Sequence, residues 1–182
     1  PDEAEPMFLE VIAASEQLLG IADPLVIDAK SHLAQLYENT HNFVASLRYY
    51  QEVYEIDQQI LGDAHPNTAG DLNNLAGIFR RLGQLRQSEA TYRQALQAMS
   101  AALGEGAPQT ISIMNNLALV LESQGLYDEA EPLYQKALAL FQVEQGKEHP
   151  TSLALNNNIA MLYEAQGDFS RAERTYQRVI EL

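Results

Sequence analysis

Three pairs of asparagines recur along the chain at a constant spacing of 42 residues. The pairs are Asn73–Asn74, Asn115–Asn116 and Asn157–Asn158. A carboxamide carries both donors and an acceptor, the groups that pair with the N–H and C=O of an extended peptide backbone. An evenly spaced row of carboxamides therefore predicts main-chain recognition of a peptide, with neighbouring side chains conferring selectivity. The alternative for any one asparagine is a solvated side chain or a hydrogen bond between neighbouring copies of the repeated segment.

Two adjacent arginines, Arg80 and Arg81, follow the first asparagine pair. Guanidinium groups suit planar anions, so these side chains could clamp a carboxylate or a phosphate. The alternative is a solvated face or a pair with an acidic neighbour. Acidic residues fall on the same arc in the copies of the segment, and they are Asp28, Glu38, Glu122 and Glu164. The expected binding surface is therefore mixed in sign.

The other titratable residues do not predict a catalytic, metal or cofactor site. The histidines are His32, His41, His65 and His149, and the last two lie 84 residues apart at equivalent turns. Metal ligands must converge within a few ångströms, whereas a linear array keeps such turns apart. We therefore expect His65 and His149 at helix-entry turns. No two carboxylates recur in an arrangement typical of a pocket, so we expect no enzyme activity.

Several polar or polarisable residues are interpreted as packing groups. Tyr50, Tyr92, Tyr134 and Tyr176 occupy one column of the repeat and are expected in the core. Met99, Met114 and Met161 are interpreted as filler, although Met161 also falls on the polar arc. Asn156 lies in a core column, so we expect it to form a hydrogen bond to another helix.

The 42-residue spacing also defines the elements that must position these side chains. Within one copy, Leu72, Leu75, Ala76 and Phe79 form one stripe at the helical period, which predicts a first helix, helix A, from about Pro66 to Leu82. A second stripe, Leu85, Ser88, Tyr92, Ala95, Leu96 and Met99, predicts helix B, which continues to about Leu103. Gly83 and Gly104 follow the two helices, as expected for left-handed helix ends. Each copy is thus an antiparallel hairpin that must be covered by the next one.

A rotation of about 100° per residue separates the apolar stripe of helix A from a second, polar arc. In a stacked array, the A helices turn this arc to the same side. The candidate groove residues on this arc are Ser31, His32, Gln35, Asn73, Asn74, Arg80, Arg81, Ser112, Asn115, Asn116, Leu119, Asn157, Asn158 and Met161.

Composition restricts the classes of partner. The chain has 182 residues, of which 46% are hydrophobic, and this content is enough for a sizeable core. No apolar run is long enough to cross a bilayer, and the formal net charge of −14 opposes binding to nucleic acid and anionic membranes. The absence of cysteine excludes disulfides and thiolate metal sites. It also favours a cytoplasmic location slightly.

The repeated columns resemble a known family. Leu72, Leu75, Ala76, Phe79, Gly83, Ser88, Tyr92 and Ala95 are similar to the consensus of the tetratricopeptide (TPR) repeat. The 42-residue period, with "HP" before helix A and "NNLA" within it, resembles the kinesin-light-chain type. This resemblance implies an all-α, right-handed superhelix (α-solenoid) of antiparallel helix pairs, about nine helices, with a concave groove lined by the A helices. Kinesin light chains recognise acidic and aromatic cargo peptides in a basic groove, but here the basic pair is confined to one repeat, so this specificity is not expected.

The repeats divide the chain as a single TPR array. We expect an orphan helix B at 1–20, followed by repeats at 24–62, 66–104, 108–146 and 150–182. The first repeat departs from the pattern, because His41 occupies the glycine column and Ser31 and His32 replace asparagines. The half-repeat at the start indicates a piece of a longer array with uncapped ends, which could support a homo-oligomer.

These features together predict a non-catalytic interaction scaffold that binds a protein or peptide in its groove. Two alternatives stay open: a regulatory or sensing segment of a larger enzyme or signalling protein, and a self-assembly module.

Overall fold

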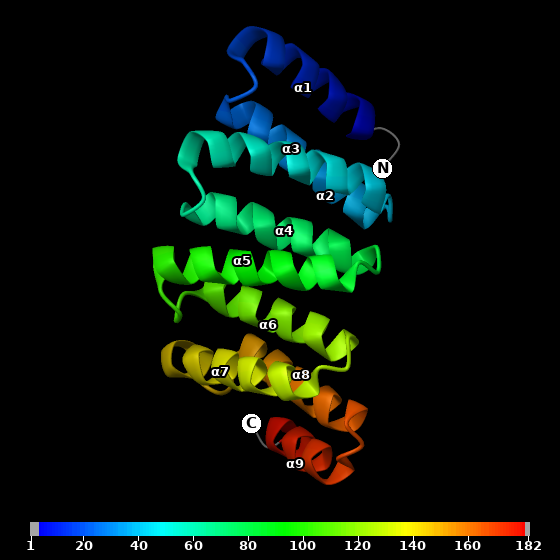
Figure 1. Cartoon of the computed structure of the whole chain (residues 1–182), viewed down its shortest axis with the longest axis vertical. Helices are drawn as coiled ribbons and strands as arrows, with labels where there is room; N and C mark the ends of the chain where they lie inside the picture. The colour runs from blue at the N-terminus through cyan, green and yellow to red at the C-terminus, as the bar shows by residue number, and fades with distance from the viewer. Residues whose placement is uncertain (1–3, 181–182) are drawn as a thin grey trace. The chain divides into compact units, whose positions relative to one another are not determined.

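The computed structural model describes residues 4–180, and these residues form nine α-helices joined by short turns (Figure 1). The helices are α1 (Ala4–Leu19), α2 (Pro24–Asn39), α3 (Phe43–Leu61), α4 (Pro66–Arg81), α5 (Leu85–Leu103), α6 (Pro108–Ser123), α7 (Tyr127–Gln145), α8 (Pro150–Ala165) and α9 (Phe169–Ile180). The predicted all-α class is confirmed. Pro1, Glu181 and Leu182, which the sequence places in the first and last helices, lie outside the described residues.

The chain divides into two compact units, residues 1–98 and residues 99–182, with the boundary inside α5. Unit 1 contains α1 to α4 and most of α5, and unit 2 contains the end of α5 and α6 to α9. Within unit 1, α2 packs against α3 and α3 packs against α4. Within unit 2, α6 packs against α7, α7 against α8, and α8 against α9. The A helices of the repeats are α2, α4, α6 and α8, and each one alternates with a B helix.

Each A helix begins with a proline in its first turn. Backbone N–H groups in this turn have no partner within the helix, so the helix loses no hydrogen bond there. The Nδ1 atom of His65 accepts a hydrogen bond from the backbone N–H of Asn67 at 3.1 Å. His149 caps α8 in the same way, with the N–H of Thr151 at 3.2 Å. The expected position of both histidines at helix entry is therefore confirmed, and each ring acts as an N-cap.

Left-handed residues end the helices and turn the chain back. Gly83 and Gly125 have φ values of 75° and 76°, and glycine adopts this conformation without a Cβ penalty. His41 occupies the same position in the first repeat and also adopts a left-handed conformation, with φ of 61°, although it departs from the glycine of the other repeats. Its ring contacts Phe43 edge to face, with 5.7 Å between the ring centroids.

The two helices of a repeat cross closely at small residues. In unit 1, Ala76 and Ser88 are fully buried, and the Ser88 hydroxyl donates to the Ala76 carbonyl at 2.7 Å. In unit 2, Ala118 and Ala130 are fully buried at the equivalent crossing. These small contacts let the A and B helices approach closely and direct the polar arc of helix A away from the core.

Two packing predictions are wrong. Met161 is 46% exposed, so it belongs to the polar face of α8 and does not fill the core. Asn156 is buried as expected, but its Nδ2 donates to the Ser152 carbonyl one turn earlier in the same helix, at 2.9 Å. An asparagine side chain within a helix can donate to the carbonyl one turn earlier, so this amide is not a link between helices.

Candidate functional site

A pocket of about 130 Å³ lies in unit 2 between the A helices of repeats 3 and 4. Its polar rim includes Ser112 and Asn115 from α6 and Asn158 from α8. Its apolar floor includes Leu155 and Phe141, both of which are buried. The pocket therefore combines amide groups at its mouth with a surface suited to an apolar side chain, a combination typical of ligand sites.

The two asparagines at this rim are joined to each other by a hydrogen bond between neighbouring repeats, which is the alternative that the sequence left open for these residues. The Nδ2 atom of Asn158 donates to the Oδ1 atom of Asn115 at 2.8 Å, from α8 to α6. One such bond uses one of the two N–H groups of Asn158 and one lone pair of Asn115. Each amide therefore retains further donor and acceptor capacity, and the bond holds both side chains in one orientation at the pocket.

The structure places every candidate groove residue at the surface or partly at the surface. The exposed residues are His32, Gln35, Asn74, Arg81, Ser112, Asn157 and Met161. The half-buried residues are Ser31, Asn73, Arg80, Asn115, Asn116, Leu119 and Asn158. The carboxamides are thus not sealed between helices, and Ser112, Asn115 and Asn158 converge on one pocket.

In unit 1, the arginine pair is engaged by groups of the protein. The Nε atom of Arg81 lies 2.9 Å from Oε1 of Glu38, so an ion pair joins α4 to α2. Arg80 lies beside the Tyr92 hydroxyl, where its charge and hydrogen bond oppose the rise that burial causes in the pKa of Tyr92. This geometry corresponds to the acidic-neighbour alternative for Arg81 and makes an exposed anion clamp a weaker interpretation.

The tyrosines of the repeated column form hydrogen bonds with acidic residues of the A helices. In unit 2, the Tyr134 hydroxyl donates to Oε2 of Glu122 at 2.9 Å. Burial raises the pKa of Glu122, although this hydrogen bond acts in the opposite direction. In unit 1, burial and then the charge of Glu38 raise the pKa of Tyr50 to about 12. The core tyrosines therefore fix the side chains of groove-facing acids while their rings pack.

The described histidines do not form a metal centre. His32 points along α2, where its Nδ1 lies 2.8 Å from the Asp28 carbonyl, and its ring stacks on Phe8. Among residues 4–180, no three His, Asp or Glu side chains gather closely enough to hold a metal ion.

The family follows from comparison with known proteins. A profile described as tetratricopeptide repeat matches residues 25–101, 70–132 and 109–182. The chain belongs to the tetratricopeptide repeat family.

Solved structures agree with this TPR assignment and with the kinesin-light-chain-like type of repeat. BtubC (BKLC) from P. vanneervenii is 27% identical, with a TM-score of 0.86 over 99% of this chain and 72% of that chain. A putative kinesin light chain from P. anserina, with nearly identical TPR-like repeats, is 22% identical, with a TM-score of 0.84 and coverage of 99% and 85%. MamA shares 17% identity, with a TM-score of 0.64 and coverage of 98% and 90%.

No curated protein sequence gives a significant match. TPR repeats generally mediate protein–protein interactions, so the family supports an interaction role at this general level. No helix in the described part of this TPR chain has both the length and the apolar character needed to cross a bilayer.

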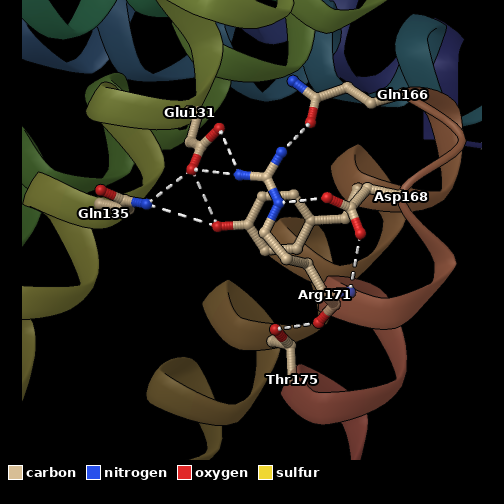
Figure 2. Close-up of polar contacts among 7 residues, drawn as sticks. Glu131, Gln135, Gln166, Asp168, Arg171 and Thr175 are labelled. Atoms are coloured by element: carbon tan, nitrogen blue, oxygen red, sulfur yellow. Dashed lines mark hydrogen bonds and ion pairs between the residues drawn. The ribbon is translucent and has the colours of Figure 1, made fainter.

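The TPR repeats of unit 2 also share a polar cluster around Arg171, which the sequence did not predict (Figure 2). The Arg171 guanidinium contacts Glu131 of α7 at 3.2 Å and Asp168 at 2.6 Å, and it lies over the Tyr163 ring. Hydrogen bonds from the Arg171 backbone and side chain lower the pKa of Asp168. A hollow of about 950 Å³ lies beside this cluster, lined by residues 125–129, Glu131 and residues 165–171, which include the starts of α7 and α9. The Arg171 side chain is 41% exposed, and its ion pair with Glu131 joins the B helices of repeats 3 and 4.

A buried lysine links the first three helices of unit 1 and was also missed. The Nζ atom of Lys30 lies 2.8 Å from Glu16 of α1 and 2.7 Å from Glu52 of α3. Equivalent positions in later repeats hold Leu72, Met114 and Asn156. A charged residue in a column where no other repeat carries a charge was the sequence feature that could have revealed this triad.

Proposed function

We propose that the polar faces of the A helices bind an extended segment of a partner protein, without catalysis. The observation that carries this proposal is the unit 2 pocket, where Asn115 and Asn158 stand at the rim of an apolar recess. The two amides offer pairing groups for a peptide backbone, and the recess can accept one side chain of that peptide. A cytoplasmic location belongs to the same proposal.

The size and lining of the pocket suggest the kind of side chain. A volume of about 130 Å³ is close to that of an apolar cavity that holds one benzene-sized group. Leu155 and Phe141 on the floor offer apolar contacts, so an aliphatic residue such as leucine or valine fits better than a charged one. Selectivity would then arise from this residue, while the amides accept many backbone sequences.

A peptide array tests the proposal directly. The wild type and the variant Asn115→Ala plus Asn158→Ala are probed against an unbiased set of peptides. Loss of each amide should weaken binding by about 1 kcal/mol, or roughly thirtyfold in Kd for both. The matched control is Gln94→Ala plus Gln97→Ala, which removes two exposed carboxamides from the B helix α5. Equal binding by the groove variant and the control would remove the site assignment.

Self-association is a second candidate because α1 exposes large apolar side chains. Met7 is 66% exposed and Leu18 is 82% exposed. Apolar groups exposed in this way favour contact with another protein surface. Light scattering over a range of protein concentrations distinguishes the two candidates, since a constant monomer mass would exclude self-association.

A further inference from the structure

Two buried aspartates face each other between repeats 1 and 2, within unit 1. Asp57 belongs to α3 and is 6% exposed, and Asp71 belongs to α4 and is 9% exposed. Equivalent positions in later repeats are apolar, with Met99 and Phe141 in the column of Asp57. The acid pair is therefore a feature of this one joint and not of the repeat in general.

The geometry of the pair requires a proton. The two carboxyl groups lie within hydrogen-bonding reach of each other. Ionised carboxylates only accept hydrogen bonds, and Oδ2 of Asp71 is buried without a donor. A bond can form between the two groups only when one of them is protonated, because two buried like charges at this distance repel each other.

The surroundings indicate which residue holds the proton. Burial, followed by the charge of Asp57 and the hydrogen bond to it, raises the pKa of Asp71 to about 7. Burial also raises the pKa of Asp57, but the hydrogen bond from Asp71 and the nearby His65 ring act in the opposite direction. Asp71 is thus the protonated donor and Asp57 the ionised acceptor.

The other titratable groups that act on the pair come from α2 and α3. On α2, the charge of Asp28 opposes ionisation of Asp57. On α3, the charge of Asp71 contributes to the raised pKa of Tyr50. On α5, Tyr92 faces Arg80, which is about 13 Å further along α4 than Asp71. The acidic neighbour on α2 adds to the repulsion that appears when the shared proton is lost.

We propose that Asp57 and Asp71 form a proton-dependent latch that ties α3 to α4, and that loss of the shared proton loosens the joint between repeats 1 and 2. The latch does not depend on a bound ligand. When the joint opens, Asp71 becomes solvated and titrates near its ordinary value of 3.8. The closed state therefore binds one extra proton between about pH 4 and pH 7, and opening becomes easier as the pH rises through this window.

Hydrogen exchange of the full chain tests the latch. Exchange of peptides from α3 and α4 is compared at pH 5 and pH 8 for the wild type and for Asp71→Asn, whose amide donates permanently to Asp57. Comparison at equal pH cancels the intrinsic exchange rate. Hydrogen exchange gives the equilibrium constant for opening of the joint. This constant for the wild type, divided by that for the variant, should be about a hundredfold larger at pH 8 than at pH 5. The charge-matched control is Glu10→Gln, at an exposed position of α1, and it should behave as the wild type.

An unchanged ratio between pH 5 and pH 8 would overturn the latch. A second measurement on the wild type keeps the test valid if Asp71→Asn folds poorly. The side-chain carboxyl resonance of Asp71, followed by carbon NMR, should titrate near neutral pH, and a midpoint below about 5 would contradict the proposal.

Discussion

Replacement of Lys30 by methionine should lower the stability of unit 1 by an amount that follows from its two ion pairs. The lysine side chain is 8% exposed, while those of Glu16 and Glu52 are 32% and 38% exposed. A hydrogen bond to a charged group contributes about 1.5–3 kcal/mol, but solvent around the partly exposed glutamates screens this interaction. Methionine retains most of the packing, so we expect a net loss of roughly 1–2 kcal/mol.

The pH dependence of this contribution has a definite sign. Burial lowers the pKa of Lys30, but the hydrogen bonds and charges of Glu16 and Glu52 outweigh burial, so the pKa lies above its ordinary value of 10.5. The stabilisation from a raised lysine pKa is complete below about pH 10 and is lost as the pH rises through the folded-state value. Wild type and Lys30→Met should therefore differ at pH 7 and converge at strongly alkaline pH.

Urea unfolding of a double-mutant cycle measures the interaction. The cycle combines Lys30→Met with Glu52→Gln, and the free energies of unfolding of four proteins give the coupling. We expect a coupling of about 1 kcal/mol. A Lys30→Met protein that is as stable as the wild type at pH 7 would refute the reasoning, because it would mean that desolvation of the lysine cancels both ion pairs.

Three predictions concern single substitutions at a helix end and at buried hydroxyls. Gly83→Ala should cost about 1 kcal/mol in chemical denaturation, because φ is 75° while an added Cβ meets no atom within 4 Å, so the whole cost is conformational. Thr110→Val should cost about 1 kcal/mol, since the Thr110 hydroxyl donates to the Gly104 carbonyl at 2.8 Å. Thr68→Val, at the equivalent position of repeat 2, should be neutral or stabilising in the same assay, because the buried Thr68 hydroxyl forms no hydrogen bond. Equal losses at the two threonines would contradict this distinction.

The sequence predicts the helices closely because local rules determine them. Helix A of the second repeat was expected to end at Leu82 and ends at Arg81, and helix B ends at Leu103 as expected. The spacing of apolar residues and the left-handed glycines act within a single turn, so no tertiary information is needed.

The contacts between repeats were less predictable, because they depend on distances between helices. Asn115 and Asn158 were both expected on the polar arc, but their mutual hydrogen bond depends on the separation of α6 and α8. The burial of Asp57 and Asp71 depends in the same way on how α4 packs against α3. A comparison of columns would have identified these acids, since a polar residue in an apolar column indicates a local exception.

Site-specific crosslinking tests the central claim of peptide binding most directly. A photoreactive residue is placed at Ser112, on the rim of the unit 2 pocket, and in a second protein at Ala139, which is exposed on the B helix α7. The best peptide from the array should crosslink strongly at position 112 and weakly at position 139. Crosslinking that is equal at both positions, or stronger at 139, would contradict binding on the face of the A helices.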